Sequence, residues 1–288
     1  MNTRRNKILN GLALSQLLGV EIGPLDKPLV EKRDGRVIYI DHSDAEKLRL
    51  AYAKDASVNV SKISVDAIWG DQTLRQVIDR YGEAMGSADG SLFVDYVVAS
   101  HVIEHVPDMI TWFQEIRSIL NSSGEVRLAI PDRRFTFDFL RRPTNLTDVL
   151  AAYSARSRIP NTQCLIDYYT NVAIPVDVVA AWQGKVTSDS LQDKRFHTVE
   201  QSLVIVRDAL QNATYQDVHC WVFTPASFAT LCADLAVNDL LDFTCHEFHD
   251  TAENDLEFIV HLRVSDDKAE KVSTWRKMAA LAHEHRPT

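Results

Sequence analysis

The sequence predicts an α/β fold built around a parallel sheet. Two short apolar runs, Val94–Ala99 and Val126–Ile130, flank a segment whose apolar residues recur at helical spacing, as in two parallel strands with a crossover helix. The first run is apolar at nearly every position, which is typical of a strand covered on both faces. Polar residues follow each run, at Ser100–His101 and Pro131–Asp132. They should therefore lie at the sheet edge where open α/β folds bind ligands.

Composition places the chain among ordinary globular proteins. Of its 288 residues, 45% are hydrophobic and 25% are charged. The formal net charge of −9, without a long basic stretch, argues against duplex nucleic acid as the main partner. The four cysteines have no CxxC spacing and no signal peptide precedes them, so we expect reduced thiols in a cytoplasmic protein. No apolar run reaches the roughly 18 residues of a membrane span, so no membrane partner is expected.

The stretch before Val94 alternates between strand-like and helix-like patterns. Residues 36–41 form a short apolar run that ends in an acidic residue, Asp41, and His42-Ser43-Asp44 can cap the helix that follows. The elements expected here are a helix over residues 3–18, a first strand running into Gly23 and Pro24, a second strand over Arg36–Asp41, a helix over Ala45–Lys54, a third strand within Val58–Val65 and a helix over Asp71–Tyr81.

After Pro131 the pattern changes. Residues 133–223 contain helical segments near 145–157, 163–182 and 198–212 and no convincing parallel strand, so we expect an inserted helical cap on the substrate side. Thr224 before a proline then begins a helix that returns the chain to the sheet. The remaining predictions are two closing strands, partly a hairpin, over Leu241–Glu247 and Glu257–Val264, and a surface helix or tail over 265–288.

Four stretches resemble motifs of a known family. They are VEIGP at 20–24, YIDHS at 39–43, FVDYVVASHVIEHVPD at 93–108 and SGEVRLAIPD at 123–132. With them the chain resembles the class I S-adenosylmethionine-dependent methyltransferases, in the subgroup with an SHVIEHV-like fourth-strand motif. The resemblance implies a Rossmann-like methyltransferase fold, with a mostly parallel seven-stranded sheet and an antiparallel last strand. Residues 1–132 and 224–264 would form the core that binds S-adenosylmethionine.

The resemblance also implies cofactor contacts by motif. A carboxylate at the tip of the second strand accepts hydrogen bonds from ribose hydroxyls in nucleotide-binding α/β folds, and Asp41 stands at this position. The implied cofactor residues are Glu21, Ile22, Gly23 and Pro24 beneath the methionine part, Asp41 with His42 at the ribose, Asp66 and Ala67 at the adenine, and Ser100 and His101 on the sulfonium side.

The first turn departs from the family pattern. An acidic-x-Gly-x-Gly-x-Gly turn is usual, whereas Leu25 and Lys27 occupy the later glycine positions here. Side chains at these positions reduce the room for close backbone approach, although Gly23 is kept. The chain is therefore either an active methyltransferase or a catalytically inactive methyltransferase-like binding module. A nicotinamide-dependent Rossmann enzyme would need G-x-G-x-x-G, which GPLDKP does not supply.

Methyl transfer requires alignment of the acceptor with the sulfonium carbon, plus a base where the acceptor is a hydroxyl. The candidate catalytic residues are His197, His219 and Asp132, and a histidine suits the role because its pKa lies near neutrality. We expect transfer of a methyl group to oxygen or nitrogen of a small molecule, such as a sugar or glycan intermediate. A cap over the site disfavours a protein or duplex substrate.

Three residues of the fourth-strand motif also have the spacing of metal ligands. On a helix, His101, Glu104 and His105 would share one face at i, i+3 and i+4. A further ligand, and a helix long enough to include His101, are not evident. We therefore expect Glu104 and His105 to brace the turn between strand and helix, and we expect no metal site.

Overall fold

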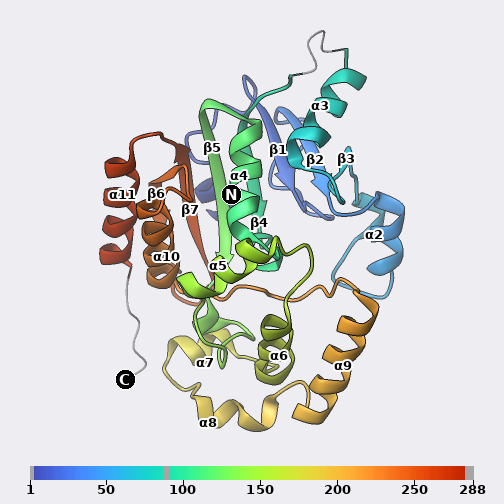
Figure 1. The fold of residues 1–288 in the computed structure, drawn as a ribbon, viewed down its shortest axis with the longest axis vertical. Coiled ribbons are helices and arrows are strands. Elements are labelled where there is room, and N and C mark those ends of the chain that lie inside the picture. Colours follow the sequence, from blue (N-terminus) through green and yellow to red (C-terminus); the bar gives the residue numbers. More distant parts are fainter. Residues whose placement is uncertain (1–2, 87–90, 283–288) are drawn as a thin grey trace.

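The computed structural model describes residues 3–86 and 91–282, and a seven-stranded sheet runs through its centre (Figure 1). The strand order is β3-β2-β1-β4-β5-β7-β6. β1 to β5 are parallel, whereas β7 pairs antiparallel with both β5 and β6. The fold class predicted from the sequence is confirmed. The strands are β1 Leu18–Ile22, β2 Arg36–Asp41, β3 Ala67–Ile68, β4 Val94–Ser100, β5 Leu120–Pro131, β6 Phe243–His249 and β7 Glu257–Val264.

Helices flank this sheet and gather beyond one end of it. In Figure 1, α3 and α4 cover one face, α10 and α11 lie beside β6 and β7, and α6 to α9 lie beyond the end at which β5 finishes. The helices are α1 Thr3–Leu9, α2 Ala45–Ala51, α3 Leu74–Ala84, α4 Met109–Ile119, α5 Leu146–Ala155, α6 Thr162–Asn171, α7 Val178–Trp182, α8 Ser188–Leu191, α9 Val199–Asn212, α10 Pro225–Val237 and α11 Lys268–Leu281. Short 3-10 turns are η1 Val60–Lys62, η2 Ile103–His105, η3 Arg133–Phe135 and η4 Gln192–Lys194.

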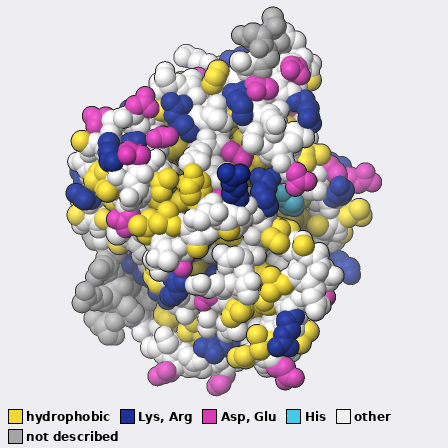
Figure 2. All heavy atoms as spheres, in the orientation of Figure 1, with side chains coloured by type: hydrophobic (Ala, Val, Ile, Leu, Met, Phe, Trp, Pro, Cys, Tyr) yellow, Lys and Arg dark blue, Asp and Glu magenta, His cyan; other side chains and the backbone are white. Residues whose placement is uncertain are grey.

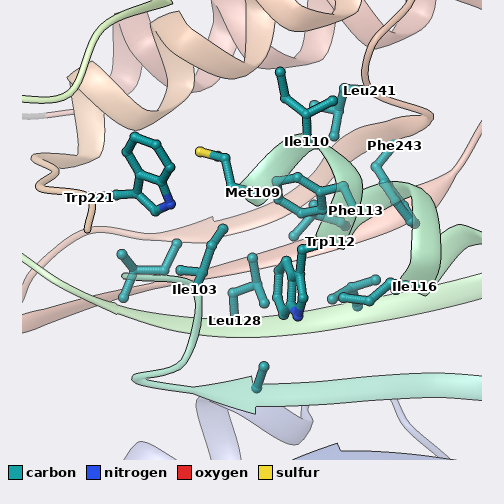
Figure 3. Close-up of a cluster of buried hydrophobic side chains, with 14 of the residues drawn as sticks. Ile103, Met109, Ile110, Trp112, Phe113, Ile116, Leu128, Trp221, Leu241 and Phe243 are labelled. Carbon is teal, nitrogen blue, oxygen red and sulfur yellow. The ribbon is translucent and has the colours of Figure 1, made fainter. Parts of the chain in front are cut away.

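The β4-α4-β5 unit forms the centre of the core. Asp108 caps α4 by accepting a backbone N–H of its first turn, and Ile110, Phe113 and Ile116 are buried on the side that faces the sheet. Figure 3 shows these apolar side chains together with Trp221, which comes from more than a hundred residues further along the chain. The core therefore joins the parallel unit to the segment that precedes α10.

The C-terminal helix is part of this core. The sequence predicts a surface helix or tail over 265–288, of which residues 283–288 lie outside the described ranges. α11 contacts α10 and β6, and Trp275 is fully buried, with its indole N–H donating to the carbonyl of Phe243 at 2.8 Å. Only one side of the helix is exposed, so its packing stabilises the β6-β7 end of the sheet.

Two predicted elements differ in the structure. The first helix ends at Leu9 instead of residue 18, because Gly11 follows with a positive φ of 80° that a right-handed helix cannot include. The predicted third strand within Val58–Val65 contains the 3-10 turn η1, where the Asn59 side chain caps the backbone. The strand that pairs with β2 on the side away from β1 is the two-residue β3.

The surface in Figure 2 shows acidic and basic side chains interspersed over the visible face, together with scattered apolar groups. Within the described ranges, none of the helices combines the length and the hydrophobicity that crossing a bilayer requires.

We predict that Gly19→Ala destabilises the sheet. A Cβ at position 19 would lie 2.0 Å from the ring of Tyr96, which is fully buried on the neighbouring strand, so the ring or the backbone must move. Overpacking of this kind lowers the free energy of unfolding by roughly 1–3 kcal/mol or more. Urea unfolding of the wild type and the variant measures this decrease.

Gly70→Ala is the matched control, since a Cβ there meets nothing within 4 Å. The decrease in the free energy of unfolding caused by Gly19→Ala should be smaller when Tyr96 is also replaced by Leu. Equal stability of Gly19→Ala and Gly70→Ala would contradict the proposed clash.

Candidate functional site

Three parallel strands bring the ends of their sequence motifs to one edge. The register pairs Ile22 with both Ile40 and Ala99, so Gly23, Asp41 and Ser100 follow at neighbouring positions. This is the edge at which open α/β sheets bind ligands.

Gly23 presents bare backbone at this edge. Its φ is +66°, and a Cβ would meet the side chain of Val102 at 3.1 Å. Its N–H donates to the carbonyl of Ile40 at 2.9 Å, which fixes the turn after β1. Of its neighbours in the motif, Ile22 and Pro24 are buried. Gly23 therefore occupies a position where a side chain would both strain the backbone and fill the space beside β4.

Asp41 ends β2 with a buried carboxylate that is 6% exposed as a residue. Its Oδ1 accepts the backbone N–H of His42 at 2.7 Å and lies 2.7 Å from the imidazole Nδ1 of the same residue. This hydrogen bond raises the pKa of His42, whose side chain is largely exposed. Asp41 and His42 thus form a local pair at the strand tip, where the sequence predicts the ribose contact.

The carboxylate of Glu21 is engaged by backbone N–H groups of the same chain. Its two oxygens accept the N–H groups of Leu29 at 2.7 Å and Val30 at 2.9 Å, so it holds the loop that follows Pro24. Burial raises the pKa of Glu21 to about 7, although both backbone hydrogen bonds act in the opposite direction. The side chain of Glu21 is therefore occupied within the protein, and its place beneath the cofactor stays a prediction.

Asp66 and Ala67 are not at the carboxyl end of β3. Asp66 precedes the strand, where its Oδ2 accepts the N–H of Tyr39 at 2.7 Å and binds the ammonium of Lys32. Ala67 pairs with Ile40, one residue short of the edge. The prediction placed them at the adenine because the third strand was expected earlier in the chain. The acidic residue that follows β3 is Asp71, in the exposed sequence Gly70-Asp71.

Ser100 and His101 are held by residues from both ends of the chain. Arg4 donates to Ser100 Oγ at 2.6 Å and to both carboxylate oxygens of Glu257, while His101 Nε2 lies 2.8 Å from Glu257 Oε2. Burial alone would raise the pKa of Glu257, but its bonds with His101 and Arg4 lower it to about 2. Sequence reasoning missed Arg4 and Glu257, since neither lies in a motif.

His219 forms the second polar centre, in the segment that precedes α10. It is 7% exposed, and its Nδ1 lies 2.6 Å from Asp138 Oδ2. Arg141 donates to the other oxygen of Asp138 at 2.8 Å and to Asp167 at 2.8 Å. Burial opposes ionisation of Asp138, but His219 and Arg141 together lower its pKa. The Asp138 contact fixes one ring nitrogen of His219 and leaves Nε2 for another partner.

Residues 217–223, here called the strap segment, hold His219 against the turn after β4. The carbonyl of Glu104 accepts the N–H groups of Cys220 at 2.6 Å and Trp221 at 3.2 Å. The indole N–H of Trp221 donates to the carbonyl of Val106 at 2.6 Å. The position of His219 beside η2 is therefore set by backbone hydrogen bonds and does not depend on side chains alone.

The other two predicted catalytic residues lie elsewhere. Asp132 is fully buried, and its carboxylate accepts from the backbone and guanidinium of Arg134 and from the hydroxyl of Thr251. These donors engage both oxygens of Asp132, which thereby joins η3 to Thr251, and its role as a base stays a prediction. His197 precedes α9 and contacts Tyr169, with ring centroids 5.4 Å apart. Tyr169 and then Tyr168 separate its ring from that of His219.

A pocket of about 590 Å³ lies between α5 and α6, next to the strap segment. Arg141 reaches both this pocket and Asp138, which connects the pocket wall to His219. Arg141 is 1% exposed, so its guanidinium belongs to the interior and not to a solvated helix face. Polar side chains contribute much of the lining, among them Arg142, Asp148 and Asn161.

Comparison with known families agrees with this geometry. The family described as a methyltransferase domain matches residues 31–235, which includes β2 to β5, the following helices and most of α10. The chain belongs to the methyltransferase-domain family. The resemblance to class I S-adenosylmethionine-dependent methyltransferases is thereby confirmed, and S-adenosylmethionine is the cofactor of this class. Curated protein sequences gave no match.

The solved structures that match this chain are distant in sequence. A Rhodobacter sphaeroides protein described as a Zn-dependent alcohol dehydrogenase is 12% identical over 92% of this chain and 90% of its own, with a TM-score of 0.46. A methyltransferase from Methanosarcina mazei is 12% identical over 91% and 98%, with a TM-score of 0.42. Magnesium protoporphyrin IX methyltransferase from Synechocystis, with bound S-adenosylhomocysteine, is 11% identical over 92% and 81%, with a TM-score of 0.39. Similarity at this level does not identify the methyl acceptor of this chain.

We predict that Glu21 makes stability depend on pH. Its folded-state pKa of about 7 lies above the ordinary value of 4.5, so its contribution is full below pH 4.5 and is lost as the pH rises through 7. Relative to Glu21→Gln, the wild type should lose about 3 kcal/mol over this range. Urea unfolding at a series of pH values measures the difference.

The exposed Glu46 provides the control, since Glu46→Gln should leave the pH dependence of the wild type unchanged. Parallel stability curves for the wild type and Glu21→Gln would show that the Glu21 carboxylate ionises as it does in water.

Proposed function

We propose that this protein transfers a methyl group from S-adenosylmethionine to oxygen or nitrogen of a small molecule, such as a sugar or glycan intermediate. The observation that carries the proposal is the position of His219. The strap segment holds this histidine beside the turn after β4, and Asp138 fixes its Nδ1. That turn also contacts Gly23 through Val102, so a cofactor above Gly23 would lie near the histidine.

The cofactor would bind across the ends of β1, β2 and β4. Gly23 would allow close approach of the methionine part, and Asp41 would accept hydrogen bonds from the ribose hydroxyls. Ser100 and His101 would line the sulfonium side, held in place by Arg4 and Glu257. This chain's residues would thus bind and orient the cofactor, while His219 Nε2 would meet the acceptor.

Residues 133–223 would form the substrate-side cap. Tyr215, just before the strap segment, lies near His42, with ring centroids 6.4 Å apart, so this segment reaches the end of β2. The 590 Å³ pocket has the volume typical of small-molecule sites, and its lining of charged and amide side chains suits a polar acceptor. A cap in this position would exclude water during transfer and leave little room for a duplex.

A methyltransferase-like binding module without activity is the second candidate. Leu25 adopts a φ of +47° in the turn after β1, where a glycine would be unstrained and would leave more room. The hydrogen bonds from Leu29 and Val30 to the Glu21 carboxylate add to the rigidity of this turn. Loss of cofactor binding would favour this candidate.

Binding of S-adenosylhomocysteine, measured by calorimetric titration, tests the proposal. The wild type should bind, and Asp41→Ala should weaken binding at least tenfold, because hydrogen bonds to a charged group are worth roughly 1.5–3 kcal/mol. Asp55→Ala is the control, since Asp55 is exposed and its side chain bonds to Ser57. A folded wild type that binds no S-adenosylhomocysteine would overturn the methyltransferase proposal.

A further inference from the structure

Three side chains from η2 and the strap segment converge beside the predicted cofactor edge. Glu104, His105 and His219 each offer one ligand atom, and these atoms all lie within 4.8 Å of one another. Glu104 and His105 are neighbours in the chain, whereas His219 comes from more than a hundred residues further on. The fold thus supplies the additional ligand that the sequence motif lacked.

The carboxylate of Glu104 is fully buried, and neither of its oxygens has a hydrogen-bond partner within residues 3–86 and 91–282. The His101 ring, which is charged only when it is protonated, places its Nδ1 3.5 Å from Glu104 Oε1. A buried carboxylate without hydrogen bonds is unfavourable by several kcal/mol or more unless a positive charge compensates it. Apart from this ion pair, the Glu104 carboxylate has no hydrogen-bond partner among the described residues, and a bound cation would supply the missing contact.

Both histidines lie beside carboxylates, His219 through a hydrogen bond and His105 through an ion-pair contact. His219 Nδ1 lies 2.6 Å from Asp138, and His105 Nδ1 lies 2.8 Å from Asp217. A carboxylate on one ring nitrogen fixes the ring and makes the other nitrogen a better ligand, which is the usual arrangement around protein-bound metals. Nε2 of each ring remains for a third partner. The Asp217 side chain is 63% exposed, so an ion can approach from solvent.

The backbone holds the three ligands in place before any ion binds. The hydrogen bonds from Cys220 and Trp221 to the Glu104 carbonyl tie the strap segment to η2 at the residue that bears the carboxylate. The rings of His105 and His219 meet edge to face, with centroids 4.7 Å apart. Little rearrangement is needed to bring three donor atoms around one ion.

We propose that Glu104, His105 and His219 bind a divalent transition-metal ion such as Zn²⁺ or Mn²⁺. Two imidazoles and one carboxylate form a ligand set that leaves an open position on the metal. The inference rests on the proposed function and specifies its acceptor, because a hydroxyl oxygen bound at the open position would lie beside the sulfonium edge. With the ion bound, His219 is a ligand and not a free base, and the expectation of no metal site is revised.

A second group of possible ligands, Glu247, His249 and His261, is held by contacts among its own members. Glu247 lies 3.1 Å from both His249 and His261, and Asn10 donates to its carboxylate at 3.4 Å. The other nitrogen of His261 contacts a backbone carbonyl at 2.9 Å. Burial, and after it the buried guanidinium of Arg127, lowers the pKa of His261 and disfavours a further positive charge there. This group supplies a comparison within the same molecule.

Cobalt(II) is the probe for the test, because its visible absorption reports the number and type of ligands. The chelator-treated full chain should bind one equivalent of Co²⁺ with a spectrum of nitrogen and oxygen ligands, and Zn²⁺ should displace it. Glu104→Gln and His105→Asn should each weaken Co²⁺ binding at least about 100-fold. Mutation of residues that only hydrogen-bond to metal ligands weakens metal binding by up to about 100-fold, and loss of a ligand should weaken it at least as much. His249→Asn, in the second group, should bind as the wild type does.

His105 is partly exposed, so His105→Asn should fold even where Glu104→Gln does not, and circular dichroism checks both. Absence of Co²⁺ binding by the folded wild type, or its loss in His249→Asn alone, would overturn the metal site. S-Adenosylhomocysteine titrated in parallel separates the two proposals. If the protein binds S-adenosylhomocysteine but not Co²⁺, the metal site is rejected and the methyltransferase proposal stands. If it binds Co²⁺ but not S-adenosylhomocysteine, the methyltransferase proposal is rejected and the metal site stands.

Discussion

The architecture of the site depends on hydrogen bonds to one carbonyl, that of Glu104. It accepts the N–H groups of Cys220 and Trp221 and so joins the turn after β4 to the segment before α10. Trp221 reinforces the junction by filling the core beside α4 and by donating to Val106 (Figure 3). Because these groups are buried, breaking the junction would leave unpaired backbone donors in the interior. The helices between β5 and α10 are thereby anchored at both ends, through β5 and through the strap segment.

In each of the two polar centres, a carboxylate pairs with a side chain from a distant part of the chain. Glu257 of β7 is shared by Arg4 and His101, and Asp138 is shared by His219 and Arg141. Each of these carboxylates stays ionised because its partners outweigh the unfavourable effect of burial. Glu21 shows the opposite balance, because its hydrogen bonds come from neutral backbone groups and burial dominates. The same residue type thus differs in charge state according to what surrounds it.

Much of the fold could be predicted from local pattern. The β4-α4-β5 unit is strongly periodic, and α10 has a proline and a capping threonine at its start, so both agree with the structure. The third strand could not be located, because two residues carry no periodicity. For the site, the sequence indicated the edge and the residues at it. It could not indicate the direction of the Glu21 carboxylate, which depends on N–H groups eight and nine residues further on.

Ion pairs between residues far apart in the sequence could not be predicted from the sequence. Arg4 and Glu257 are 253 residues apart, and Asp138 and His219 are 81 residues apart. Nothing in their local sequences marks them, since an isolated arginine or aspartate is usually solvated. His219 was selected for its chemistry alone, and the fold gave it a buried carboxylate partner. His197, selected on the same grounds, lies two aromatic rings away from it.

The brevity of β3 and the irregularity of β6 have a consequence for self-association. These strands form the two margins of the sheet. β3 contributes only two residues, and the pairing of β6 shifts register between Cys245 and Glu247 while α11 packs beside it. A strand from a second copy would find neither a long nor a regular row of free backbone groups to pair with. Protection against edge-to-edge aggregation is therefore built into the ends of this sheet.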